Sequence, residues 1–325
     1  MSDFDSPEFD LVTRPKPDDV SFDLNTALNA VVSLTSRTPE NAFTAQTLGT
    51  ERAGNGVLIR NDGLILTIGY LITEAESVWI VDNNGKACAA HVVGYDQETG
   101  LGLVQAMGRL DIKPLKIGNS ATLSEDEPVI FAGSGGRENA MCAEIVSTRE
   151  FAGYWEYVLD QAIFITPAHH NWGGGAMIAM DGTLRGIGSL FVQQAHDGET
   201  PLNGNMVVPI DLLAPIMDDL LMYGKINKPT RPWLGILTTE VNDHLMIGGL
   251  AHGGPAEKAG LETGDLILEI DGRPVNELVE MYRFIWASGN AGVDVPMEIL
   301  RDGESIHIQV RSASRSDFFV SPKMH

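Results

Sequence analysis

The chain has 325 residues, of which 43% are hydrophobic, and it contains 35 glycines and 16 prolines. This length suggests two domains, and the composition is typical of a globular protein rich in strands and turns, with enough apolar material for a core. With 44 acidic against 22 basic residues, the net charge is −22. Such an excess argues against nucleic acid or an anionic membrane surface as partner, because both are polyanions.

Residues 1–24 form an acidic, proline-bearing stretch in which Phe4, Phe9 and Phe22 are spaced among the charges. Two interpretations stay open: a disordered tail, or an arm that docks its phenylalanines on a partner or a neighbouring subunit. The stretch has no apolar run typical of a secretory signal, and no segment of the sequence is long enough to span a bilayer. We therefore expect no membrane span and a cytoplasmic protein. Cys88 and Cys142 predict no disulfide framework and are expected to be small residues of strands.

Short apolar segments separated by turn residues fill the next 140 positions. Asn61-Asp62-Gly63 and Asn83-Asn84-Gly85 each lie between two such segments and predict tight hairpins. Further strands are expected at 101–106, 129–132, 144–148 and 157–166. This spacing indicates an antiparallel barrel or sandwich.

A glycine-rich loop follows the last of these strands, at 166–177. Gly173, Gly174 and Gly175 allow a sharp bend, and such a bend after an apolar strand often presents a catalytic nucleophile or cradles an anion. An Asp181-Gly182 turn then predicts a hairpin within 177–190. The side chain at the apex of the loop is Trp172, which has no nucleophilic oxygen or sulfur.

The first long helix is expected at 211–223. Asp211 is the predicted N-cap, Pro215 falls in the first turn, and Gly224 suits the position after the last turn. Residues 225–232 form a basic, proline-containing linker, which is the best domain boundary in the sequence. Beyond it, a helix at 276–287 lies between predicted strands.

These motifs resemble the HtrA/Deg family of trypsin-like serine proteases, over about residues 26–312. The resemblance rests on the segments Gly54–Ile59, Asp62–Thr67, Gly94–Asp96, Thr99–Val104, Asn171–Gly174, Val207–Ile210 and Leu234–Val310. It implies a mainly β chain, with a trypsin-like double antiparallel β-barrel followed by a PDZ domain. The domains expected from it are an acidic arm (1–24), the double barrel (25–224), the linker (225–232), the PDZ domain (233–312) and a C-terminal tail (313–325).

Three positions depart from the family's catalytic pattern. The histidine position holds Tyr70, the aspartate position holds Gly100, and the serine position holds Trp172. His170 replaces the glycine that shapes the oxyanion hole, and it would adopt a positive φ only under strain. Because acyl transfer on this template needs a hydroxyl, an imidazole and a carboxylate, we expect a pseudoprotease that is not an enzyme. A residual or rewired serine-type endopeptidase is the alternative.

A second alternative is a metal-binding module at His169 and His170. Adjacent side chains usually point apart, and the sequence has no nearby Cys-x-x-Cys or His-x-x-x-His pattern. We therefore expect solvent-facing or hydrogen-bonded loop histidines, and no metal or cofactor.

The PDZ segment retains the parts of a peptide-binding site. By resemblance, backbone N–H groups of Leu234, Gly235 and Ile236 receive a peptide's C-terminal carboxylate. Leu278, Tyr282 and Ile285 fall on one helix face and, by resemblance, line the groove beside it; alternatively they only complete the core. The sequence thus predicts a protein-binding scaffold, a chaperone-like adaptor or an accessory subunit of a complex. The resemblance also implies a homo-oligomer, with a trimer as the family's common form.

Overall fold

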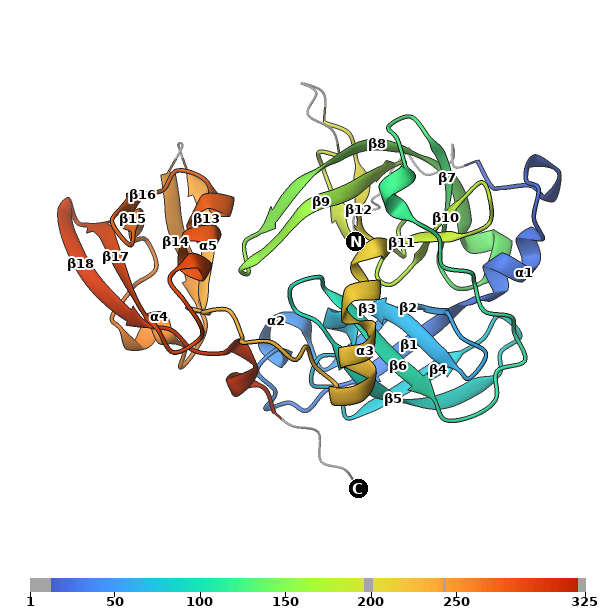
Figure 1. The fold of residues 1–325 in the computed structure, drawn as a ribbon, viewed down its shortest axis with the longest axis horizontal. Helices are drawn as coiled ribbons and strands as arrows, with labels where there is room; N and C mark the ends of the chain where they lie inside the picture. The colour runs from blue at the N-terminus through green and yellow to red at the C-terminus, as the bar shows by residue number, and fades with distance from the viewer. Residues whose placement is uncertain (1–12, 196–200, 242–243, 321–325) are drawn as a thin grey trace, which may run out of the picture. The chain divides into compact units, whose positions relative to one another are not determined.

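The computed structural model describes residues 13–195, 201–241 and 244–320. Within them the chain forms two compact units. The first comprises the residues up to 149 together with 161–226, and the second comprises 150–160 together with 227–320. Figure 1 labels the α-helices and the strands of both units.

The first unit begins with a closed six-stranded antiparallel barrel in the order β1-β2-β3-β6-β5-β4 (Figure 1). Both predicted hairpin turns are present, with Gly63 and Gly85 at positive φ. Fully buried aliphatic side chains fill its interior, as the alternation of these strands requires. The strands are β1 (Val31–Arg37), β2 (Glu51–Leu58), β3 (Leu64–Ile68), β4 (Ser77–Val81), β5 (Ala87–Tyr95) and β6 (Leu101–Ala106).

A second closed barrel follows in the order β10-β11-β12-β9-β8-β7. Its core is built around Phe131, Met177 and Val207. Cys88 lies in the first barrel and Cys142 in the second, both in strands as predicted, although Cys142 is only partly buried. The strands are β7 (Pro128–Ala132), β8 (Ala140–Gly153), β9 (Tyr157–Thr166), β10 (Ala176–Ala179), β11 (Leu184–Val192) and β12 (Gly204–Pro209).

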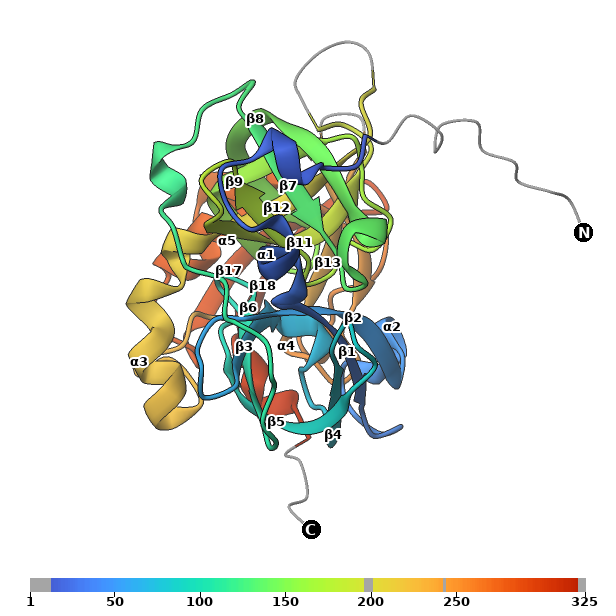
Figure 2. The same cartoon turned by 90° about the vertical axis from the view of Figure 1, so that its right-hand side faces the viewer.

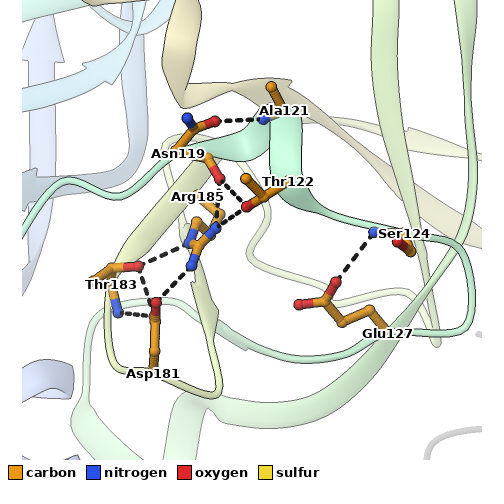
Figure 3. A network of polar contacts seen from close by, with 8 residues as sticks. All are labelled: Asn119, Ala121, Thr122, Ser124, Glu127, Asp181, Thr183 and Arg185. Atoms are coloured by element: carbon orange, nitrogen blue, oxygen red, sulfur yellow. Dashed lines mark hydrogen bonds and ion pairs between the residues drawn. The ribbon is translucent and has the colours of Figure 1, made fainter.

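Arg185 fastens the segment between the two barrels to the β10–β11 hairpin (Figure 3). Its guanidinium group contacts Asp181 at 2.6 Å, Thr183 at 2.8 Å and the Thr122 hydroxyl at 2.9 Å, and it donates to the Asn119 carbonyl. The predicted Asp-Gly turn therefore also anchors the inter-barrel connection.

Helix α3 (Ala214–Tyr223) runs along the outside of the first barrel beside β5 (Figures 1 and 2). Pro215 lies in its first turn and Gly224 ends it in the left-handed conformation, as predicted. The predicted N-cap is wrong, because Leu213 precedes the helix. Asp211 lies in a short 3₁₀ helix and accepts hydrogen bonds from the Ser120 hydroxyl and the Ala121 N–H, both at 2.7 Å.

The described part of the N-terminal stretch contacts the second barrel. The Cys142 N–H donates to the Thr13 carbonyl at 2.7 Å, and Phe22 lies against Gly182 of the β10–β11 turn. Phe22 thus docks within its own chain, whereas Phe4 and Phe9 lie outside the described residues. The remaining short helices of this unit are η2 (Pro17–Asp19), α1 (Leu24–Asn29), α2 (Ala45–Leu48), η3 (Gly69–Leu71), η4 (Ser120–Thr122), η5 (Gly136–Asn139) and η6 (Ile210–Leu212).

The second unit is an antiparallel sheet in the order β13-β14-β15-β17-β18, with β16 paired to β15. Helix α5 (Leu278–Ala287) begins two residues later than predicted and buries Met281, Tyr282 and Ile285 in the core of this unit. Its other elements are β13 (Ile236–Val241), β14 (His244–Leu250), α4 (Pro255–Lys258), β15 (Leu266–Ile270), β16 (Arg273–Pro274), β17 (Asp294–Arg301), β18 (Glu304–Arg311) and η7 (Arg315–Phe318). The predicted mainly β architecture of a double barrel followed by a smaller sheet is confirmed.

Candidate functional site

Tyr70 lies in η3, directly after β3. A buried guanidinium group holds this segment, because Arg52 donates to the Tyr70 carbonyl at 2.8 Å and to the Thr73 carbonyl at 2.9 Å. The Tyr70 hydroxyl donates to the Ser189 carbonyl at 2.8 Å. Burial raises the pKa of Tyr70 well above its ordinary value, against an opposing hydrogen bond from the Trp172 side chain. The phenol therefore stays protonated at neutral pH and acts as a hydrogen-bond donor.

Gly100 lies in the turn between β5 and β6, beside the segment that carries Tyr70. It has a φ of 78°, and its carbonyl accepts a hydrogen bond from the Gly69 N–H at 2.6 Å. Asp96 shapes the same turn by accepting from the Thr99 N–H at 2.9 Å. The position next to Tyr70 thus supplies a backbone carbonyl and no side chain.

The glycine-rich loop is cross-linked by a fully buried amide of β2. The Asn55 side chain donates to the carbonyls of Asn171 and Gly173, both at 3.0 Å, and accepts from the Ser134 N–H at 2.8 Å. Gly174 has a φ of 75°, and a Cβ there would lie 2.0 Å from the Asn55 carbonyl oxygen. Only glycine fits this approach of the two backbones.

Trp172 covers the core of the second barrel at the apex of this loop. Its ring packs on that core and lies 5.8 Å from the Phe191 ring, centroid to centroid. At the next residue, a Cβ added to Gly173 would lie 2.7 Å from the Tyr70 hydroxyl. The structure therefore brings positions 70, 100 and 172 together, and the Trp172 side chain hydrogen-bonds with Tyr70.

His169 is a buried, hydrogen-bonded loop residue. Its Nδ1 accepts from the Asn171 N–H at 3.0 Å, which leaves Nε2 to donate to the Asn139 carbonyl at 3.1 Å. Burial, reinforced by His170, lowers the pKa of His169 to about 4. The imidazole is therefore neutral, and both of its nitrogens are already used.

His170 is exposed, and its ring stacks on that of His169 with centroids 4.9 Å apart. The expectation that the two side chains point apart is therefore wrong. The φ of His170 lies outside the left-handed region, so its backbone carries none of the strain expected for an oxyanion-hole conformation. Across the described part of the chain, no cluster of three or more His, Cys, Asp or Glu side chains could hold a metal ion.

The loop that opens the second unit directs three backbone donors at one carboxylate. The N–H groups of Leu234, Gly235 and Ile236 lie 3.2, 2.8 and 3.3 Å from one carboxylate oxygen of Glu156. Gly235 has a φ of 78°, which turns successive N–H groups toward the same point. The sequence indicates this loop but gives no signal for Glu156, an acidic residue 78 positions before Leu234 with no local motif around it.

The three helix residues predicted to line the groove occupy different environments. Tyr282 and Ile285 are fully buried in the core, where the Tyr282 hydroxyl accepts a hydrogen bond from the Glu156 N–H at 3.1 Å. Leu278 is only partly buried and lines a pocket of about 610 Å³ together with Leu237 and Thr239 of β13. Ile285 therefore only completes the core, whereas Leu278 lines the pocket.

Comparison with known proteins places these two regions in named families. The model of the trypsin-like peptidase domain matches residues 54–187, and that of the PDZ domain matches residues 232–311. A probable periplasmic serine endoprotease DegP-like of Pseudomonas fulva is 27% identical over 274 residues, which cover 79% of this chain and 55% of that protein. A serine protease Do-like HtrA of Lactobacillus helveticus is 26% identical over 294 residues, covering 81% and 69%. The chain spans about half the length of the DegP-like relatives it matches.

Solved structures show the same fold. The serine endoprotease from Yersinia pestis superposes with a TM-score of 0.51 and 23% identity, covering 90% of this chain and 98% of that one. The HtrA-type protease AlgW with a decapeptide superposes with a TM-score of 0.53 and 18% identity, covering 90% and 98%. In the described residues, none of the helices has the length and apolar composition needed to cross a bilayer.

These relatives contradict two expectations. The expectation that the chain is not an enzyme, which rested on three replaced side chains, is contradicted. The relatives are named serine endoproteases and point to a protease. The expectation of a cytoplasmic protein is contradicted by relatives named periplasmic. The cytoplasmic expectation rested on the lack of an apolar run typical of a secretory signal, whereas the similarity to these relatives extends over about four fifths of the chain. The paired domain matches and these relatives establish that the chain belongs to the HtrA family of trypsin-like serine proteases with a PDZ domain.

Proposed function

We propose that this chain binds polypeptides by capturing a free C-terminal carboxylate in the loop formed by Leu234, Gly235 and Ile236. The observation that carries the proposal is the convergence of three backbone N–H groups on one carboxylate oxygen at 2.8 to 3.3 Å. A peptide carboxylate and a glutamate carboxylate are the same chemical group, so the loop has the geometry to hold either. Charge-assisted bonds of this kind are about twice as strong as neutral ones.

The residues next to the loop suit an extended peptide. Strand β13 is at the edge of its sheet, and an edge strand offers main-chain groups for an added strand. The pocket beside it carries Leu237 and Leu278, which would accept an apolar side chain of the peptide. Main-chain bonds would then supply affinity, and this pocket would supply selectivity.

The chain would use this site as an adaptor or accessory subunit that holds polypeptides in the compartment of its periplasmic relatives. Whether it also cleaves a bound polypeptide depends on the site at positions 70, 100 and 172. Any hydrolysis measured for the chain has to be assigned to groups other than Trp172, because an indole cannot form an acyl intermediate. The family resemblance further supports a homo-oligomer, a proposal that light scattering during size-exclusion chromatography tests directly.

Binding of short peptides to the full chain tests the proposal. A fluorescent peptide with an apolar C-terminal residue is titrated in two forms, one with a free C-terminal carboxylate and one with a C-terminal amide. We expect saturable binding of the acid form and at least tenfold weaker binding of the amide, about 1.4 kcal/mol. Equal affinity for the two forms, or binding of neither to the native chain and to Glu156→Ala, would refute carboxylate capture.

A further inference from the structure

Glu156 lies at the tip of the β8–β9 hairpin, in the left-handed backbone conformation. The hairpin residues 150–160 belong to the second unit, although their flanking strands are part of the second barrel. Glu156 has a φ of 61°, which is unfavourable for a residue with a Cβ and is maintained only where surrounding contacts compensate. Those contacts are the interactions of its carboxylate and backbone.

The hairpin tip makes the two kinds of contact that a bound C-terminal peptide would make. Its carboxylate accepts from the three N–H groups of the loop, and the Tyr154 carbonyl accepts from the Thr238 N–H at 3.3 Å. Tyr154 precedes Glu156 by two residues, and Thr238 follows Ile236 by two residues. This reciprocal spacing is that of a strand running antiparallel to β13.

Side-chain packing fixes the rest of the hairpin tip in the second unit. Val158 is buried in the core of this unit and Ala152 packs against it. At the base of the tip, Arg283 of α5 pairs with Asp160 at 2.9 Å and also with Glu150. The tip is therefore held at three places: at its apex by the loop, along one side by the core, and at its base by an ion pair.

We propose that the hairpin tip is a built-in ligand of the PDZ domain, and that a polypeptide with a free C-terminus must displace Glu156 before it can bind. This inference rests on the proposed function, because it assigns the same loop to an internal and an external carboxylate. The loop has one set of three N–H groups, and all three are directed at Glu156. The two ligands are therefore mutually exclusive at this site.

Competition with a tethered ligand sets the size of the expected effect. A tethered group acts at an effective concentration in the millimolar range, so the external peptide binds only to the fraction of molecules in which the tip is released. Removing the Glu156 carboxylate takes away the group that occupies the three N–H groups of the loop. We expect Glu156→Ala to increase the affinity for the acid-form peptide by on the order of 10- to 100-fold.

The test compares the native chain with Glu156→Ala and with Glu304→Ala in the peptide titration described above. Glu304→Ala removes an exposed negative charge from β18 of the same unit, outside both the hairpin tip and the loop. We expect Glu304→Ala to bind the peptide within about threefold of the native chain. Equal affinity of the native chain and Glu156→Ala would overturn the built-in ligand while leaving carboxylate capture intact. Binding to neither protein would instead refute the proposed function and the inference with it.

Amide hydrogen exchange supplies a readout that does not depend on peptide affinity. In the native chain the N–H groups of Leu234, Gly235 and Ile236 should exchange slowly, and in Glu156→Ala they should exchange rapidly. Saturating acid-form peptide should restore their protection in the variant, whereas the amide form should not. Slow exchange in Glu156→Ala without peptide, in a variant with native circular dichroism, would contradict the proposal.

Discussion

The glycine-rich loop of the second barrel and the carboxylate loop of the PDZ unit use glycine in the same way and for different ends. Gly174 and Gly235 have φ values of 75° and 78°, and each allows backbone groups to converge. In the barrel loop these groups are tied to Asn55, and the apex is covered by Trp172. In the PDZ loop they are directed at the carboxylate of Glu156. The backbone groups of the glycine-rich loop therefore hold the barrel structure together, whereas those of the PDZ loop hold a group that resembles a ligand.

The largest expected effect is a loss of stability when a side chain is added to the glycine-rich loop of the second barrel. In Gly174→Ala the new Cβ would lie 2.0 Å from the Asn55 carbonyl oxygen, a distance that forces the backbone to move. We expect a loss of about 4 kcal/mol or more in the free energy of unfolding, measured by urea denaturation. The matched control is Gly85→Ala, with a φ of 81° and no atom within 4 Å of the added Cβ. It should cost only about 1 kcal/mol, and equal losses in the two variants would show that the close approach is not a constraint.

The turns of the double barrel and its glycine-rich loop could be predicted from sequence because their signals are local. Turn residues such as Asn61-Asp62-Gly63 and the run of three glycines each specify their backbone conformation from their own covalent structure. The same holds for Pro215 and Gly224 at the two ends of α3. The N-cap prediction at Asp211 failed because a tertiary partner, the Ser120 region, competed for the carboxylate.

The occupant of the PDZ loop could not be predicted, because no local pattern connects Glu156 with Gly235. The pair forms only when a hairpin of the double-barrel segment joins the compact unit of the PDZ domain. The expectation that the chain is not an enzyme rests on three side chains, at positions 70, 100 and 172. The relatives that contradict it are named serine endoproteases and match over 79% of the chain.

Removing the amide that ties the barrel loop should have the next largest effect. Asn55→Ala would leave the Ser134 N–H and the Asn171 carbonyl without this buried partner, whereas the Gly173 carbonyl keeps its bond from the Asn55 backbone N–H at 2.8 Å. Each buried polar group left unsatisfied costs about 1–3 kcal/mol, so we expect a loss of about 3 kcal/mol in the free energy of unfolding. Asn119→Ala, which removes an exposed side chain bonded to one N–H, serves as control and should cost about 1 kcal/mol or less. A loss at Asn55 no greater than at Asn119 would contradict the assigned role.

The buried imidazole of the same loop should make the stability of the barrel unit depend on pH. Burial lowers the pKa of His169 from 6.5 to about 4, so between these values the unfolded chain binds a proton that the native chain does not. The stabilisation is therefore complete above about pH 6.5 and is lost as the pH falls toward 4. We expect a decrease of about 2–3 kcal/mol over this range, measured by urea denaturation at each pH. His169→Gln should lose this dependence and His91→Gln, an exposed site of the first barrel, should keep it. The same slope in all three proteins would exclude His169 as its source.

The smallest expected effect concerns the PDZ loop, because the Glu156 side chain that occupies it should itself titrate. Burial raises the pKa of Glu156 from 4.5 to about 7, against the opposing N–H groups of the loop and the charge of Arg315 in η7. Tyr282 of α5 also faces Glu156, and burial holds its pKa far above this range, so it stays neutral.

The docked tip therefore binds a proton more readily than the released tip, and docking strengthens as the pH falls from about 7 toward 4.5. An external peptide, whose terminal carboxylate is ionised throughout, should bind the native chain about tenfold more tightly at pH 8 than at pH 6. In Glu156→Gln the competing group does not titrate, so the affinity should be nearly constant between these pH values. A native affinity that is flat or that falls with rising pH would show that the carboxylate of Glu156 is not what the peptide displaces.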